Sequence, residues 1–167
     1  MSTTNRTSLL LVALLTLAPA CRPHPVPTPT APPPTDPALA ALPLPERLAR
    51  EAQSRPAASP RAEQVLAALG AAGLSLSPAE QVLGSTIGAS FCTLAGTAHG
   101  TALAVCEFAS AEIARRGLDY SRQTFDRLIP GRTLDLKGQT LLTITRGAPG
   151  PLADAEARTA LAAFQQL

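Results

Sequence analysis

Two stretches in the middle of the chain decide its fold: residues 87–92 are IGASFC and residues 103–108 are LAVCEF. The first alternates Ile, Ala and Phe with Gly, Ser and Cys, and the second alternates Leu, Val and Glu with Ala, Cys and Phe. Successive side chains of a β-strand point to opposite faces, so this pattern predicts strands. The small residues between the two stretches predict a turn near residues 95–100. We therefore expect an antiparallel hairpin.

A second hairpin is predicted downstream, over residues 132–145. Its two halves, RTLDL and QTLLTIT, show the same alternation, and Lys137-Gly138 lies between them. Lys-Gly is a weaker turn signal than Asn-Gly, but the flanking pattern favours a turn at this point.

Helical periodicity covers the segments around the hairpins. Apolar residues recur at helical spacing in residues 60–72, 109–128 and 154–166. Ser77 and Glu80 match a capping box, which predicts one further short helix.

The order of the main elements is helix, strand, strand, helix, strand, strand, helix (α-β-β-α-β-β-α). Hairpins separated by helices predict an α+β domain with a mainly antiparallel four-stranded sheet. Each strand offers one strongly apolar side, so we expect the helices to pack on one face of that sheet. We place this domain at residues 59–167.

Cys92 and Cys106 are predicted to form a disulfide bond. If they lie opposite each other, the hairpin loop centres on His99, and a non-hydrogen-bonded antiparallel pair brings the two Cα atoms to about 4.5 Å. The alternative is a pair of buried thiols. A metal site of these three residues is not expected, because His99 at the tip would lie roughly 10 Å from the cysteines. We predict no metal and no cofactor.

The same domain offers little for catalysis. His99 is its only histidine, and residues 88–92 begin like Gly-x-Ser-x-Gly but end in cysteine. Glu107 lies on a predicted strand, where we expect it at an edge or facing solvent. We predict no catalytic residues; the alternative is a small periplasmic enzyme that uses His99 with Ser90 or Glu107.

The N-terminus is typical of an export signal. Residues 1–8 are polar and carry Arg6, and an apolar stretch of about a dozen residues begins at Leu9. That stretch is shorter than the roughly 20 residues needed to span a bilayer. Ala18 and Ala20 provide the small residues that a signal peptidase requires, and Cys21 follows directly.

Ala18, Ala20 and Cys21 resemble the lipobox of bacterial lipoproteins, although Ala18 replaces the usual leucine and Pro19 is an uncommon neighbour. The resemblance implies cleavage before Cys21, lipidation of its thiol and attachment to the membrane through the lipid. Arg22 in place of aspartate favours the outer membrane, with the domain in the periplasm. Plain secretion with Cys21 free is the alternative.

A proline-rich tether follows the cysteine. Ten of the 17 prolines lie between Cys21 and Pro45. Such a segment favours an extended polyproline II spacer of about 3.1 Å per residue, so residues 22–45 could reach roughly 75 Å. The predicted organisation is a signal peptide at 1–20, a lipidated cysteine and tether at 21–58, and the domain at 59–167.

The charge of the chain argues against nucleic acid as a partner. The net charge of +2 gives no electrostatic footprint for nucleic acid. The sequence therefore predicts an exported envelope lipoprotein whose domain is a non-catalytic interaction or ligand-binding module, with other envelope proteins as candidate partners.

Overall fold

The computed structural model describes residues 37–167, so the predicted signal peptide and Cys21 lie outside the described residues. An antiparallel sheet of five strands forms the centre of the fold, in the order β1-β2-β3-β5-β4. The strands are β1 (Glu80–Val82), β2 (Phe91–Gly96), β3 (Thr101–Glu107), β4 (Thr133–Lys137) and β5 (Thr140–Arg146). The α+β class is confirmed.

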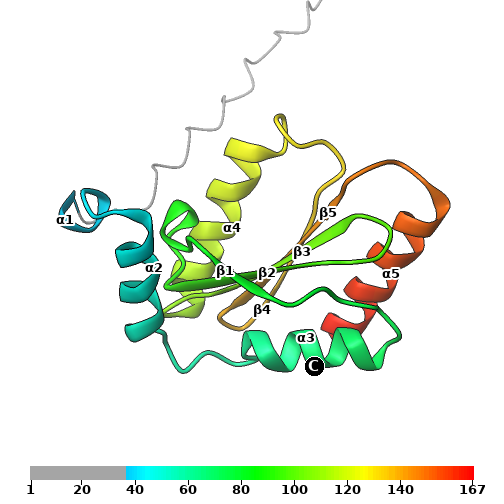
Figure 1. Cartoon of the computed structure of the whole chain (residues 1–167), viewed down its shortest axis with the longest axis horizontal. Helices are drawn as coiled ribbons and strands as arrows, with labels where there is room; N and C mark the ends of the chain where they lie inside the picture. Colours follow the sequence, from blue (N-terminus) through cyan, green and yellow to red (C-terminus); the bar gives the residue numbers. More distant parts are fainter. Residues whose placement is uncertain (1–36) are drawn as a thin grey trace, which may run out of the picture.

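Helices cover both faces of the sheet. They are α1 (Pro37–Ala40), α2 (Leu44–Gln53), α3 (Ala62–Ala71), α4 (Ala111–Phe125) and α5 (Pro151–Gln166), with a short 3-10 helix, η1 (Ser85–Ile87). Helices α3 and α5 lie on one side of the sheet and α4 on the other (Figure 1). The prediction that all helices share one face is wrong. Strand β5 contains two consecutive buried leucines, Leu141 and Leu142, whose side chains face opposite ways and need cover on both sides.

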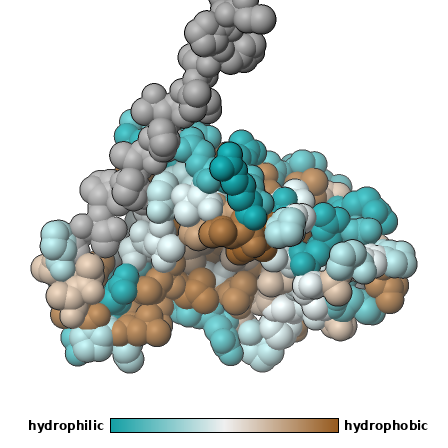
Figure 2. Space-filling model, turned by 90° about the horizontal axis from the view of Figure 1, so that it is seen from above, coloured by the Kyte–Doolittle hydropathy of each residue, from teal (hydrophilic) through white to brown (hydrophobic). Residues whose placement is uncertain are grey.

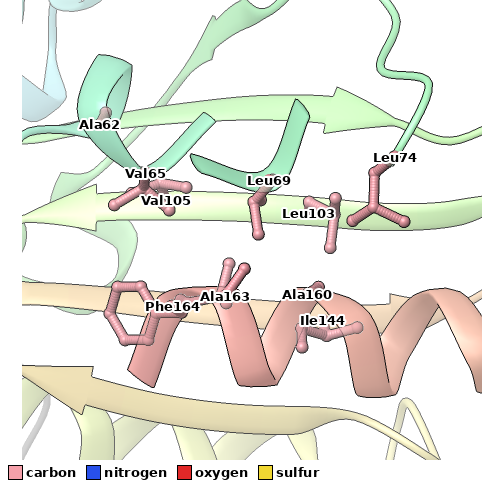
Figure 3. Packing of buried hydrophobic residues seen from close by; sticks show 11 residues of the cluster. Ala62, Val65, Leu69, Leu74, Leu103, Val105, Ile144, Ala160, Ala163 and Phe164 are labelled. Carbon is pink, nitrogen blue, oxygen red and sulfur yellow. The ribbon is translucent and has the colours of Figure 1, made fainter. Parts of the chain in front are cut away.

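The larger core lies between the sheet, α3 and α5 (Figure 3). Strands β3 and β5 contribute apolar residues from alternate positions, which meet the buried stripes of the two helices. Its largest members are Val65, Leu69, Leu103, Val105, Leu142, Ile144 and Phe164, each at most 1% exposed. These contacts hold α3 and α5 against one face of the sheet.

A smaller core lies beneath α4. Ser110 caps the helix by accepting a hydrogen bond from the backbone N–H of Ile113 at 3.2 Å. Gly117 then brings the helix close to the sheet: a Cβ at this position would lie 2.4 Å from Cε1 of Phe108 and 2.7 Å from the carbonyl oxygen of Ile87. The sequence pattern predicted that this helix runs to residue 128. It ends instead at Phe125, and Leu128 beyond it is 72% exposed.

The fifth strand replaces a predicted helix. Ser77 does not cap a helix; its N–H donates to the carbonyl of Gly96 and its Oγ accepts from the Gly96 N–H, at 2.8 and 2.9 Å. These bonds bring the following residues alongside β2, so Glu80 to Val82 form edge strand β1. A capping-box pattern is local, and pairing with the hairpin overrides it here.

The two predicted hairpins are present. Strands β2 and β3 pair with Cys92 opposite Cys106. Strands β4 and β5 pair with Lys137 opposite Thr140, so the turn residues are Gly138 and Gln139, one position later than predicted. Gly138 has a φ of +58°, a conformation that favours glycine.

Residues before the predicted domain boundary also pack on the sheet. Residues 37–45 were expected to be extended, but they contain α1 and the first residues of α2. Glu51 of α2 is only 4% exposed and accepts hydrogen bonds from the N–H groups of Gly84 and Ser85 at 2.8 and 2.9 Å. The packed unit thus includes part of the segment assigned to the tether. Among helices within residues 37–167, none has the length and apolar character needed to cross a membrane.

Candidate functional site

The predicted disulfide bond joins Cys92 on β2 to Cys106 on β3. The two residues are direct register partners, and their Cα atoms are 4.1 Å apart. Both side chains are almost fully buried in the core beneath α4. The bond fixes the register of the central hairpin and leaves neither thiol free for metal or redox chemistry.

Glu107 is fully buried, which overturns the prediction that it lies at an edge or faces solvent. Its carboxylate accepts from Nε and Nη2 of Arg55 at 2.7 and 2.6 Å, and from the N–H of Ala62 at 2.6 Å. The Arg55 guanidinium also stacks over Phe91, 4.1 Å from the ring centroid. These hydrogen bonds raise the pKa of Arg55 above its ordinary value. The pair is a structural link between the α2 segment and the sheet.

His99 does not meet Ser90 or Glu107. The N–H of Ser90 donates to the carbonyl of Glu107 at one end of the β2–β3 hairpin, whereas His99 lies in the turn at the other end. The six residues of β2 separate the two ends, which is about 20 Å at 3.3 Å per residue. The three residues considered for catalysis therefore do not form one site.

His99 instead pairs with Glu156 of α5. Nδ1 of His99 lies 2.8 Å from Oε1 of Glu156, and the other carboxylate oxygen accepts from the hydroxyls of Thr97 and Thr101 at 2.6 and 2.9 Å. An ionised carboxylate can only accept, so Nδ1–H of His99 is the donor of this hydrogen bond. The pair borders a cavity of about 260 Å³ that Ser75 also lines.

The hydroxyl groups around Glu156 favour its ionised form. Burial alone would raise the pKa of this carboxyl, but the hydrogen bonds from Thr97, His99 and Thr101 lower it below the ordinary 4.5. The cluster ties the hairpin turn to the first half of α5. Within residues 37–167, no hydrogen bond joins Ser75 to His99.

A second hollow lies on the opposite face of the sheet, beside the C-terminal half of α4. It has a volume of about 280 Å³ and is lined by η1, the middle of the sheet and the end of α4. We call it the α4 groove, and its lining includes Ile87, Ala104, Phe125, Ile129, Arg132 and Thr143. Seen from above, apolar side chains are exposed near the middle of the molecule and are bordered by hydrophilic ones (Figure 2).

Small side chains create the α4 groove. On the α4 face, Cys106 and Leu141 are covered by the first half of the helix. Further along the same face come Ala104 and its register partner Thr143, and both are only half-buried. On the other face, the neighbouring residues Leu103 and Ile144 are buried to 1% exposure or less. The sheet is therefore closed by α3 and α5 on one side and open on the other.

Arg132 supplies the charge of the α4 groove. Its side chain is 6% exposed, and it donates from Nη2 to Oγ of Ser121 at 2.8 Å and from Nη1 to the Ser121 carbonyl at 3.3 Å. Asp126 lies 3.3 Å from Nη1, and the guanidinium carbon is 5.5 Å from the centroid of the Phe125 ring. Burial lowers the pKa of this guanidinium below its ordinary value, and Asp126 opposes the effect.

Two of the residues that define the hollows could not be found from the sequence. Glu156 and Arg132 are single charges in a helix and at the start of a strand, and nothing local distinguishes them from solvent-exposed charges. No family model, curated protein or solved structure matches this chain.

Proposed function

We propose that this protein is an exported envelope lipoprotein, anchored through Cys21, whose domain is a non-catalytic module that binds a ligand in the α4 groove. The open half of the sheet carries this proposal. Exposed apolar hollows on a small domain are typical of binding sites. On the opposite face Leu103, Val105, Leu142 and Ile144 are buried beneath α3 and α5, whereas Ala104 and Thr143 on the α4 side are only half-buried.

The chemistry of the lining also favours binding over catalysis. The groove residues are mostly aliphatic or carry hydroxyl groups, with one aromatic ring and one guanidinium. They provide an apolar surface and one polar anchor, as ligand sites usually do. The rigid sheet and the buried disulfide beneath α4 would hold that surface in place without a ligand.

A direct test of the anchor is the intact mass of the membrane-bound protein. A chain that begins at Cys21 and carries the mass of attached acyl chains is expected. A soluble product with an unmodified Cys21 would contradict the anchor. It would leave the groove unaffected, because the described domain does not include that residue.

The groove is tested with the neutral fluorescent probe N-phenyl-1-naphthylamine. The chain from residue 22 onward retains every described residue and carries no lipid, and it should bind the probe with saturable enhancement of fluorescence. Thr143→Trp fills the groove and should abolish the enhancement. Thr159→Trp, which fills the cavity beside His99, is the matched control and should leave it intact. Thermal unfolding of both variants establishes that each is folded.

A small enzyme remains the second candidate, because of the pair that His99 forms with Glu156. A carboxylate that orients an imidazole is a common element of acid–base catalysis. The two candidates are separated by His99→Ala. Loss of a measured turnover without loss of stability would favour the enzyme, whereas a binding module should keep its probe binding.

A further inference from the structure

The α4 groove combines an apolar surface with a nearly buried cation. Arg132 is the only charged residue among those that line it, within the described part of the chain. Its side chain is 6% exposed, while the rest of the lining is apolar or carries only hydroxyl groups. A charge in such surroundings is poorly hydrated, so an anion that reaches it gains more than it would at an open surface.

The hydrogen bonds of Arg132 leave part of the guanidinium free. A guanidinium has five N–H donors in a planar fork. Three hydrogen bonds are formed: two to Ser121 and one to Asp126. They use both N–H groups of Nη1 and one of Nη2. The Nε–H and the second Nη2 N–H bond to no described residue, and these two donors together match the two oxygens of a carboxylate.

The counter-ion of Arg132 is a weak one. Asp126 lies 3.3 Å from Nη1 and is 48% exposed, so water screens the interaction. The hydrogen bond to Asp126 uses only one N–H group of the Arg132 guanidinium. Because Asp126 is the only acidic side chain bonded to Arg132 in the described residues, its removal would leave the guanidinium more strongly attractive to an incoming anion.

We propose that the α4 groove binds a single-chain carboxylate amphiphile of the fatty-acid class. The carboxylate would bond to Arg132, and the hydrocarbon chain would lie over Ala104 and Thr143 against Phe125 and Ile129. This inference rests on the proposed binding function of the groove and adds the chemical class of the ligand. Charge complementarity distinguishes this occupant from a neutral lipid or from an apolar peptide segment.

The experiment is displacement of N-phenyl-1-naphthylamine from the chain that starts at residue 22. Three competitors share one hydrocarbon chain length and differ only in their head group: dodecanoate, dodecanol and dodecyltrimethylammonium. All are used below the concentrations at which they form micelles. Dodecanoate should displace the probe at a concentration about tenfold lower than dodecanol, as expected for one charge-assisted hydrogen-bonded contact, and the cationic competitor should be the weakest.

Two variants assign the preference to Arg132. Arg132→Gln should still bind the neutral probe but should no longer distinguish dodecanoate from dodecanol. Asp126→Asn keeps Arg132 and removes its partial counter-ion, so it should bind dodecanoate several-fold more tightly than the wild type does. It provides an independent test if Arg132→Gln fails to fold.

The outcomes separate this inference from the function on which it depends. Binding of the neutral probe with equal displacement by all three competitors would overturn the carboxylate proposal and leave the binding function standing. Absence of probe binding would overturn both. An unchanged affinity of Asp126→Asn for dodecanoate would contradict the role of Arg132 in recognition.

Discussion

Arg55 donates two hydrogen bonds to the fully buried carboxylate of Glu107, although the two residues are 52 positions apart. Glu107 is the last residue of β3, next to the disulfide, and Arg55 follows α2. The pair therefore fastens the segment after α2 to β3, the central strand of the sheet.

The first prediction concerns this ion pair. Arg55→Ala would leave the carboxylate of Glu107 buried without its charged partner, and breaking a buried pair in this way costs about 3–5 kcal/mol. Urea unfolding measures the loss. Arg116→Ala is the control, because Arg116 forms an exposed pair with Glu112 at 2.8 Å, and such pairs contribute less than about 0.5 kcal/mol. Equal losses of unfolding free energy in Arg55→Ala and Arg116→Ala would show that the buried carboxylate of Glu107 is not stabilised by Arg55.

The second prediction compares two helical glycines. A Cβ at Gly117 would lie 2.4 Å from Cε1 of Phe108 and 2.7 Å from a backbone oxygen, whereas a Cβ at Gly70 meets nothing within 4 Å. Gly117→Ala should destabilise the protein by about 1–3 kcal/mol, because the helix must move away from the sheet. Gly70→Ala should stabilise it by up to about 1 kcal/mol through helix propensity.

Thermal or urea unfolding distinguishes the two alanine variants. The opposite signs are the essential result, since both substitutions make the same chemical change. A stabilising Gly117→Ala would mean that α4 does not lie as close to Phe108 as described.

The third prediction concerns the disulfide bond between Cys92 and Cys106. The bond closes a loop with a sequence separation of 14, and a loop of about 15 residues corresponds to about 3 kcal/mol of stabilisation. The double variant Cys92→Ala/Cys106→Ala should lose about that much in urea unfolding. Reduction of the wild type should have a similar effect.

Peptide mapping without reducing agent provides the chemical check on the same bond. A peptide that links Cys92 to Cys106 is expected in the protein purified without reducing agent. Recovery of both residues as alkylated free thiols would contradict the bond.

The fourth prediction concerns pH. The pKa of Glu156 is lowered in the folded protein, so its carboxylate contributes stability above its ordinary pKa of 4.5. That contribution is lost as the pH falls below 4.5 and through the lowered pKa of the folded state. Glu156→Gln should therefore be less stable than the wild type at neutral pH, and the difference should shrink in acid.

Urea midpoints measured from pH 7 downward test this dependence. Glu112→Gln is the control, because the Glu112 side chain is 75% exposed. A difference between wild type and Glu156→Gln that stayed constant with pH would show that the hydrogen bonds to this carboxyl do not depend on its charge.

The hairpins and the disulfide register could be predicted because their information is local. Cys92 and Cys106 lie at equal distances from the turn, so the alternation of the strands places them opposite each other. The positions of the helices could not be predicted in this way. Leu141 and Leu142 are adjacent and point to opposite faces, but periodicity alone does not say which helix covers each of them.

Polar pairs between residues far apart in the chain could not be predicted from the sequence either. The partners of Glu107 and of His99 lie 52 and 57 positions away. A charged residue in a strand pattern is usually exposed, and only the fold reveals that Arg55 covers Glu107. The α4 groove could not be predicted from the sequence, because it depends on where α4 ends relative to Ala104 and Thr143.

A map of amide chemical shifts tests whether the α4 groove is the binding surface. The chain from residue 22 onward, labelled with 15N, is titrated with N-phenyl-1-naphthylamine. If the groove binds the probe, saturable shift changes concentrated at Ala104, Ile129 and Thr143 are expected. No saturable change, or changes concentrated around His99 and Glu156 instead, would contradict it.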